Sequence, residues 1–279
     1  MGNQAKEFSG QYGEDRFLIE HKLVPARGVF VDVGAGDPVR FSNTYYLEQL
    51  GWKGLCIDAD PKQIEALTKR RTCAVEWAAV TSDDGEVELL QCEDPDYSTT
   101  LDHLPTVAAN RGLGYRLTRV PALKLETILE KHNIETINLL SVDTEGNELD
   151  VCETLDWDKH RPRVVVIEYF TWDRPSQEEA IRDYFAGLPY RLVHRTTANL
   201  IFKEAQVRRL LRRPSPVRTY LASQDKKRFP VGIEIDSAGQ APAHVAWLPA
   251  TPYRRRETSL ELDAPLSSSR SRLKPWSRL

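Results

Sequence analysis

The sequence predicts an α/β fold with a doubly wound, mostly parallel sheet, in a chain of 279 residues of which 41% are hydrophobic. Short apolar runs typical of buried strands alternate with stretches of helical period along residues 29–203. The first run, Val29-Phe30-Val31-Asp32-Val33, ends in a tight turn at Gly34-Ala35-Gly36. At the far end, 190–196 and 200–202 are expected to form an antiparallel pair that closes the sheet.

The elements between these two ends follow one another in the order that such a sheet requires. A short helix over 44–50, capped by Asn43, is expected to stop at Gly51. Asp60 before Pro61 predicts a helix start, because an acid caps the first turn and proline suits its first position. The other expected elements are strands at 54–58, 74–80, 86–89 (folded back as a hairpin through Asp84-Gly85), 137–143 and 163–168, helices at 125–132, 144–155 and after a capping box at Ser176, and an irregular loop at 93–114.

Charge and proline content divide the chain near residue 204. Residues 204–279 hold 15 Lys and Arg against 7 Asp and Glu, a net charge of +8, which leaves −11 for residues 1–203. The same segment holds 8 of the 17 prolines. We therefore expect a domain over 1–203, whose residues 1–28 form a helical lid or cap, and a basic, proline-rich C-terminal extension over 204–279.

The extension offers several alternatives. Its segment 207–213 is a candidate basic amphipathic helix. It is either a solvated surface helix, a peripheral contact to an anionic membrane surface, or a contact to the acidic domain of its own or a neighbouring chain in a homo-oligomer. A small hairpin is expected at 232–236 and 244–248, and a disordered end at 267–279.

Composition also bounds the location and partners. No stretch approaches the roughly 20 apolar residues of a membrane span, and residues 1–6 contain no apolar signal core, so we expect a cytoplasmic protein without a transmembrane segment. No nucleic-acid partner is expected. The four cysteines, Cys56, Cys73, Cys92 and Cys152, show no paired metal spacing and are expected to be reduced and structural.

The glycine turn predicts a ligand without phosphate. In the dinucleotide fingerprint G-x-G-x-x-G the third glycine lets helix and strand pack closely, and Val39 takes its place here. Asp37 would also set a negative charge where a pyrophosphate binds a helix N-terminus. S-adenosylmethionine, with its ammonium and sulfonium, fits better, with Gly34 and Gly36 giving backbone access and Asp32 near the ammonium.

Acids gather at the carboxyl ends of the predicted strands, where a doubly wound sheet binds its ligand. Asp58 lies 22 residues beyond Gly36, close to the roughly 20 at which an acid reaches ribose hydroxyls. It either binds a ribose or caps the next helix, a role that Asp60 already fills. The acids that end the two later central strands are Asp143, Glu145 and Glu168.

Six motifs, in family order over roughly residues 8–203, resemble the FkbM family of S-adenosylmethionine-dependent methyltransferases. This resemblance implies a class I methyltransferase (Rossmann-like) fold, a seven-stranded sheet with one antiparallel strand, and methyl transfer to a hydroxyl of a natural-product scaffold or of a sugar in a glycolipid or polysaccharide. The family usually has Glu at the position of Asp58 and often Pro at that of Ala59, and the extension has no counterpart. The motifs are 9–18, 30–36, 42–48, 51–58, 141–149 and 165–168.

Methyl transfer to an alcohol needs a general base or a divalent cation, because an alcohol is a poor nucleophile at neutral pH. Asp143 and Glu168, with Glu145 one turn away, are candidates for both roles, either as hard oxygen ligands of Mg²⁺ or as the base. His194 is an alternative base, or a structural histidine on its strand. The catalytic candidates are therefore three carboxylates and one imidazole.

The donor site has further candidates. Ser42 and Asn43 either hydrogen-bond the carboxylate of the donor or cap the next helix. Gln11 and Tyr12 either fold over the donor as a lid or belong to an N-terminal helix packed on the sheet.

Three classes of function fit these patterns. We expect an O-methyltransferase that acts on a small-molecule or glycan acceptor. An NAD(P)-dependent oxidoreductase is disfavoured by Val39 and Asp37, and the third class is a non-catalytic scaffold that binds S-adenosylmethionine. Selectivity for the acceptor is expected to depend on residues 93–114, where no motif indicates a particular compound.

Overall fold

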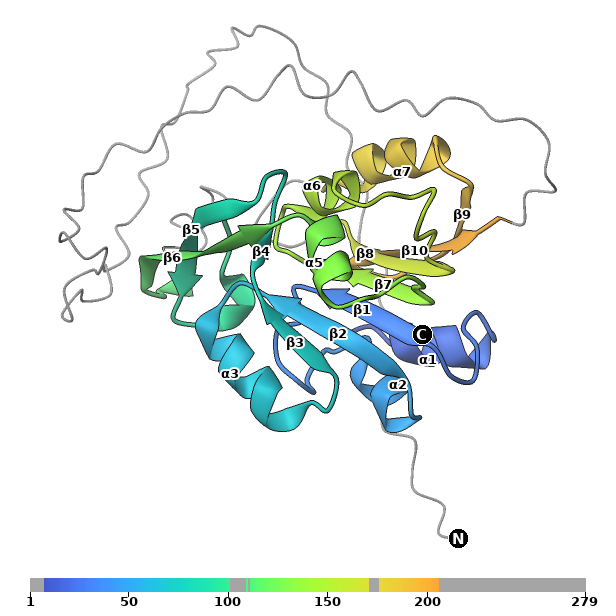
Figure 1. Ribbon diagram of the computed structural model, residues 1–279, viewed down its shortest axis with the longest axis horizontal. Coiled ribbons are helices and arrows are strands. Elements are labelled where there is room, and N and C mark those ends of the chain that lie inside the picture. The colour runs from blue at the N-terminus through green and yellow to red at the C-terminus, as the bar shows by residue number, and fades with distance from the viewer. Residues whose placement is uncertain (1–7, 101–108, 110, 171–175, 206–279) are drawn as a thin grey trace, which may run out of the picture.

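The computed structural model describes residues 8–100, 109, 111–170 and 176–205, and shows a seven-stranded sheet in the order β3-β2-β1-β7-β8-β10-β9 (Figure 1). Neighbouring strands from β3 to β8 are parallel, while β10 is antiparallel to both β8 and β9. The predicted doubly wound sheet with one antiparallel strand is thus confirmed. The strands are β1 (Val29–Val33), β2 (Lys53–Asp58), β3 (Ala74–Trp77), β7 (Leu139–Val142), β8 (Val164–Glu168), β9 (Tyr190–Arg195) and β10 (Asn199–Glu204).

Helices cover both faces of this sheet. On one face α1 (Glu14–Glu20), α2 (Tyr45–Gln49) and α3 (Pro61–Arg70) pack through a cluster that includes Leu18, Leu47 and Leu67. On the other face α5 (Leu125–Lys131), α6 (Glu148–Glu153) and α7 (Glu178–Ala186) pack through a larger cluster that includes Ile128, Val151 and Phe185. Central strands such as β8 are buried on both faces, which explains their continuous apolar sequence.

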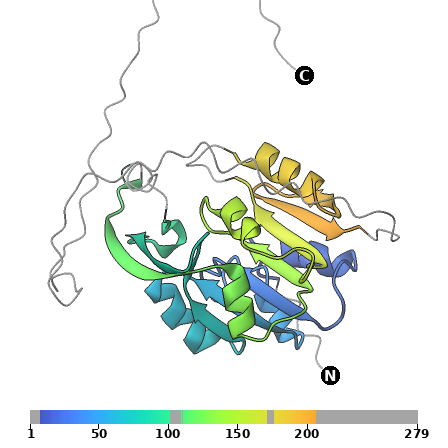
Figure 2. The same ribbon diagram turned by 45° about the horizontal axis from the view of Figure 1, so that its top comes forward.

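A second sheet of three strands, in the order β4-β6-β5, stands on the side away from α7 and β9 (Figure 2). It consists of β4 (Ala79–Val80), β5 (Gly85–Cys92) and β6 (Tyr115–Leu123), with the short 3-10 helix η1 (Pro95–Tyr97) after β5. Strand β5 pairs along its whole length with β6, from Gly85 opposite Ala122 to Cys92 opposite Tyr115.

This sheet corrects two predictions. Residues 74–80 form two strands in different sheets, since the chain leaves the main sheet between β3 and β4. The expected hairpin of 86–89 with 74–80 is wrong, because the partner of β5 is β6, whose first residues directly follow the predicted loop. Strand alternation indicates that a segment is half-buried, but it does not identify the neighbour.

Two helix starts also differ from the prediction. Asn43 does not cap α2; the Oγ of Ser42 accepts from the amides of Thr44 and Tyr45, while Asn43 donates to the Oγ of Ser141. Helix α6 begins at Glu148 rather than at residue 144, because the chain first turns through positive φ at residues 145 and 146. By contrast, Asp60 caps α3 as predicted, since its side chain accepts from the amide of Lys62.

The remaining predictions concern cysteines, membranes and the extension. All four cysteines are free thiols, and the Sγ atoms of Cys56 and Cys73 lie 3.5 Å apart. Within the described residues, every helix is too short or too polar to cross a bilayer. The expected elements of the extension, at 207–213, 232–236, 244–248 and 267–279, lie outside the described residues.

Candidate functional site

A cavity of about 320 Å³ lies at the carboxyl ends of the parallel strands. Its walls come from the segments that follow β1, β2, β7 and β8, from the second sheet, and from the residues before α1. The predicted site residues that line it are Gln11, Tyr12, Gly34, Gly36, Asp58, Asp143, Glu145 and Glu168. The topology therefore brings together most of the acids predicted from separate strand ends, as expected for this kind of sheet.

The two glycines of the first turn have different tasks. Gly34 has φ 72°, and a Cβ there would lie 1.6 Å from the carbonyl oxygen of Asp143. Only glycine allows the end of β1 to approach the end of β7 this closely. Gly36 has φ 56°, but a Cβ there would meet no atom within 4 Å. Because Gly36 lines the cavity, its missing side chain leaves room for a ligand.

The carboxylate of Asp58 is fixed by two backbone amides. Its Oδ2 accepts from the amide of Gly36 at 2.9 Å, and its Oδ1 accepts from the amide of Asp60 at 2.8 Å. Burial raises the pKa of Asp58 to about 6, with a further contribution from the charges of Asp60 and Asp32. Since Asp60 caps α3, Asp58 is not needed as the cap, and each of its oxygens retains a second lone pair.

Three carboxylates form a cluster at the other end of the cavity. Oxygen atoms of Asp143, Glu145 and Glu168 all lie within 4.8 Å of one another. Glu168 is buried, whereas Asp143 and Glu145 are half-buried. We call these three side chains the carboxylate cluster. Acids this close can share one cation or one proton, so the cluster can serve as a general base or as a set of hard oxygen ligands.

The N-terminal segment closes one side of the cavity. Gln11 and Tyr12 line it, and the pKa of Tyr12 is raised by burial and by the charges of Glu14, Glu168 and Asp143. The segment is held in place by the buried Glu14, whose carboxylate accepts from the Tyr12 amide and from the Asn199 side chain at 2.9 and 3.0 Å. Helix α1 packs on the sheet, and Gln11 and Tyr12 lie before its first residue and line the cavity, so their role as a lid over the donor stays a prediction.

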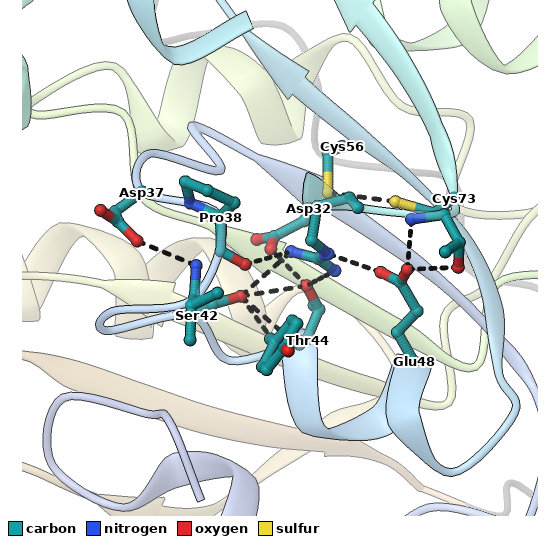
Figure 3. Close-up of polar contacts among 12 residues, drawn as sticks. Asp32, Asp37, Pro38, Ser42, Thr44, Glu48, Cys56 and Cys73 are labelled. Atoms are coloured by element: carbon teal, nitrogen blue, oxygen red, sulfur yellow. Dashed lines mark hydrogen bonds and ion pairs between the residues drawn. The ribbon is translucent and has the colours of Figure 1, made fainter. Parts of the chain in front are cut away.

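Two predicted donor-site residues, Asp32 and Ser42, belong to a buried hydrogen-bond network (Figure 3). Asp32 accepts from the Oγ1 of Thr44 at 2.6 Å, and burial raises its pKa. Arg71 donates to Thr44 at 2.9 Å and to the Oγ of Ser42 at 3.3 Å. Neither Asp32, Ser42 nor Asn43 lines the cavity. Their hydrogen bonds hold the loop between β1 and α2 in place.

Arg71 is the centre of this network. Its guanidinium pairs with Glu48 and also donates to the carbonyl oxygen of Pro38 at 3.4 Å. Both members of the ion pair are buried, with side-chain exposures of 0% and 3%. Sequence reasoning missed this residue, because an arginine after the last turn of an amphipathic helix is ordinarily solvated.

His194 lies outside the cavity. Its ring stacks on that of Phe17 in α1, with a centroid distance of 3.8 Å and an interplanar angle of 13°. This packing matches the structural alternative for His194 rather than the role of general base. Other residues that line the cavity are Arg40, which the sequence did not single out, and the segment 98–100, which bridges to β5. No local pattern links that segment to the site.

A seven-stranded sheet in this order, with β10 reversed and a glycine turn facing an acid after β2, defines a site of the class I methyltransferase type. The profile of the Methyltransferase FkbM domain matches residues 32–192, which is more than half of the chain. The chain therefore belongs to the FkbM methyltransferase family. It is a methyltransferase, and its methyl donor is S-adenosylmethionine.

Several solved methyltransferase structures resemble this chain, with low sequence identity and low TM-scores. A methyltransferase from Geobacter sulfurreducens is 11% identical, with a TM-score of 0.38 and coverage of 71% of this chain and 80% of that chain. A TehB-like SAM-dependent methyltransferase from Corynebacterium glutamicum is 14% identical, with a TM-score of 0.38 and coverage of 70% and 88%. An O-methyltransferase from Bacillus cereus, in complex with SAH, is 11% identical, with a TM-score of 0.39 and coverage of 72% and 84%. A comparison with curated protein sequences gave no match.

Proposed function

We propose that this chain transfers the methyl group of S-adenosylmethionine to a hydroxyl of a sugar or of a natural-product scaffold. The observation that supports the proposal is the shared cavity, in which the Gly36–Asp58 pair lies at one end and the carboxylate cluster at the other. When bound, the donor supplies an electrophilic methyl group on a sulfonium leaving group. The chain then has to hold donor and acceptor in line and accept the proton of the acceptor.

The residues of the donor end fit a cationic nucleoside ligand. A volume of about 320 Å³ is at the small end of ligand cavities. The open space beside Gly36 leaves room for the donor to approach the main chain. The fixed carboxylate of Asp58 can accept hydrogen bonds from both hydroxyls of one ribose. Acidic lining residues favour the positive charge of the donor, and the apolar side chains of Ala78, Val80 and Leu89 suit a planar base.

The carboxylate cluster lies where the acceptor would react. We assign the role of proton acceptor to Asp143 or Glu168, with Glu145 beside them, because all three face the same cavity within 4.8 Å. The same three residues would hold a Mg²⁺ ion, whose chemistry would be to lower the pKa of the hydroxyl. The charges of Asp143 and Glu168 contribute to the raised pKa of Tyr12, so Tyr12 lies near the cluster and would cover the reacting groups.

Two other functions compete with this proposal. The oxidoreductase loses its basis with the family assignment, since the position of the third glycine is Val39 and the chain is a methyltransferase. A scaffold that binds the donor without catalysis would need neither the carboxylate cluster nor a cavity that reaches it. The cavity is lined both by the Gly36–Asp58 pair and by the carboxylate cluster, which favours an enzyme over a scaffold.

Calorimetry followed by a transfer assay tests the proposal. We expect S-adenosylmethionine to bind and NAD not to bind in parallel titrations of the full chain. Transfer of labelled methyl groups to glycolipid and secondary-metabolite fractions, with and without EDTA, then separates the base from the metal: activity that survives EDTA assigns the cluster to the base role. Binding without transfer to any fraction would support the scaffold, and binding of NAD alone would overturn the proposal.

A further inference from the structure

The segment 98–100 connects the second sheet to the catalytic end of the cavity. Thr99 is 2% exposed, and it pairs with Leu90 of β5 through two backbone hydrogen bonds, Leu90 N to Thr99 O at 2.8 Å and Thr99 N to Leu90 O at 3.2 Å. The Oγ of Ser98 donates to the Oδ2 of Asp60 at 2.9 Å. Both residues are thus anchored to regular structure, and their position does not depend on a ligand.

From this anchored position the segment reaches the turn that follows β7. The Oγ1 of Thr99 donates to the carbonyl oxygen of Glu145 at 3.2 Å. The side chain of Asn147 donates to the Oγ1 of Thr100 at 3.0 Å. Two threonines next to the second sheet therefore contact two residues of the turn that follows β7, although the contacts join positions more than 40 residues apart in sequence.

The turn needs such support because of its backbone. Glu145 has φ 54°, in the left-handed region that a residue with a Cβ rarely adopts, and such strain persists only where the surroundings impose it. From the opposite side, Glu148 accepts from the amides of Thr144 and Gly146 at 3.0 and 2.9 Å, and Gln177 donates to the carbonyl oxygen of Gly146 at 3.2 Å. The strained residue is clamped between these contacts and Thr99.

We infer that Thr99 is a positioning residue for the carboxylate cluster. Its hydroxyl fixes the backbone of Glu145 in the left-handed conformation, and this conformation brings the Glu145 carboxylate within 4.8 Å of Asp143 and Glu168. Because this hydrogen bond joins the Thr99 hydroxyl to the main chain of Glu145, Thr99 acts on the carboxylate cluster through the position of Glu145. The consequence for catalysis rests on the proposed function, whereas the effect on the turn does not.

The same segment connects the two ends of the cavity. Asp60, which holds Ser98, also accepts from the side chain of Gln91 at 2.6 Å and caps α3 beside the donor end. Residues 98–100 therefore form a brace from the donor end to the carboxylate cluster. Part of the stretch expected to select the acceptor serves to position the catalytic groups.

The inference is tested with Thr99→Val, which removes the hydroxyl at similar volume, and Thr99→Ser, which keeps it. The matched control is Thr81→Val, since the Thr81 hydroxyl also donates to a backbone carbonyl, that of Asp83 at 2.9 Å, but lies outside the cavity. Hydrogen exchange by mass spectrometry reports on the peptide 143–148, and calorimetry reports on the affinity for S-adenosylhomocysteine. If Thr99→Val fails to fold, Thr99→Ala removes the same hydroxyl without a new methyl contact.

In Thr99→Val we expect exchange in 143–148 to be about fivefold faster, the effect of one lost hydrogen bond. Thr99→Ser and Thr81→Val should match the wild type in this peptide, and the affinity for S-adenosylhomocysteine should stay within about twofold in all variants. The kcat of Thr99→Val should fall about tenfold or more, because misplaced catalytic groups lose rate rather than binding. Unchanged exchange in Thr99→Val would overturn the inference. An inactive wild type would instead refute the proposed function, and the exchange result would still decide the role of Thr99.

Discussion

The amide of Gly36 donates to the Oδ2 of Asp58 across 2.9 Å, and this hydrogen bond joins the end of β1 to the end of β2 at the wall of the cavity. The second carboxylate oxygen accepts from Asp60, so the carboxylate cannot rotate freely. A fixed acceptor of this kind suits a ligand with two adjacent hydroxyl groups.

Replacing Asp58 should weaken the binding of the donor and of its product, S-adenosylhomocysteine. We expect Asp58→Ala to bind S-adenosylhomocysteine about tenfold to hundredfold more weakly, as hydrogen bonds to a charged group are lost. Isothermal titration calorimetry measures this change. Asp84→Ala is the control, because Asp84 is an exposed acid that also accepts from a backbone amide, that of Lys124. Equal affinities in wild type and Asp58→Ala would show that Asp58 does not contact the ligand.

The raised pKa of Asp58 predicts a pH dependence of donor binding. Below its pKa of about 6 the carboxyl group is protonated and loses acceptor capacity, so the affinity for S-adenosylhomocysteine should fall about tenfold between pH 7 and pH 5. Asp58→Asn, which does not titrate, should bind weakly and show no such fall. Calorimetry at three pH values checks this, and an equal decline in both proteins would assign the pH dependence to another group.

The same group affects folding stability with the opposite trend. The folded-state pKa of Asp58 lies above its ordinary value of 3.8, so the folded protein binds more protons between these two pH values than the unfolded chain. The free energy of unfolding of the ligand-free protein should therefore decrease as pH rises from about 4 to 6, and this contribution should be absent in Asp58→Asn. Urea unfolding of both proteins across this range measures the difference.

Substitutions at the two glycines of the turn should have different effects: Gly34→Ala should lower folding stability, and Gly36→Ala should weaken donor binding. Gly34→Ala places a Cβ 1.6 Å from the Asp143 carbonyl oxygen and should lower the free energy of unfolding by about 3 kcal/mol or more. Gly36→Ala places its Cβ in open space, so only the left-handed backbone, about 1–2 kcal/mol, opposes it. Its main effect should be weaker donor binding, because the methyl group enters the cavity. If Gly36→Ala binds S-adenosylhomocysteine like the wild type, the ligand does not approach this residue.

The buried ion pair between Arg71, which follows α3, and Glu48 in α2 should contribute far more to folding stability than an exposed ion pair within α3. Arg71→Met leaves Glu48 buried without its cation and should cost about 3–5 kcal/mol of unfolding free energy. Lys69→Met breaks the exposed pair with Glu65, and should change it by less than about 1 kcal/mol. Urea unfolding of the two variants compares them, and similar values for both would mean that the network around Arg71 contributes little.

The sequence predicted the parts of the fold that depend on local chemistry. The strand at 29–33 agrees with β1 in both bounds, and the Asp60-Pro61 start of α3 is confirmed, because continuous apolar runs and helix caps act over a few residues. The partner of β5 was mispredicted, since pairing is decided by contacts across the sheet rather than within the strand. Gly34 could be marked as a turn, but not as the contact point with Asp143.

The candidate site shows the same division. Acids at strand ends could be predicted to converge, because parallel strands end at one edge of the sheet, and Asp58, Asp143, Glu145 and Glu168 do line one cavity. Asp32 was expected beside the donor from its place next to the turn. Its side chain accepts a hydrogen bond from Thr44 in the Arg71 network, and its contact with the donor stays a prediction. The brace at Thr99 depends on a hydrogen bond between the segment after η1 and the turn after β7, and the sequence has no local signal for such a contact.

The central proposal is that this protein transfers a methyl group from S-adenosylmethionine to a hydroxyl of an acceptor bound in the cavity. The most direct measurement incubates the full chain with S-adenosylmethionine carrying a deuterated methyl group and with lipid, glycan and metabolite fractions from cells in which the gene is deleted, followed by mass spectrometry. We predict one new deuterated methyl ether that the wild type forms and the double variant Asp143→Asn/Glu168→Gln forms at least about a hundredfold more slowly, because both candidate proton acceptors are lost. Binding of the donor with no labelled product in any fraction, or equal rates for the wild type and the variant, would contradict this account.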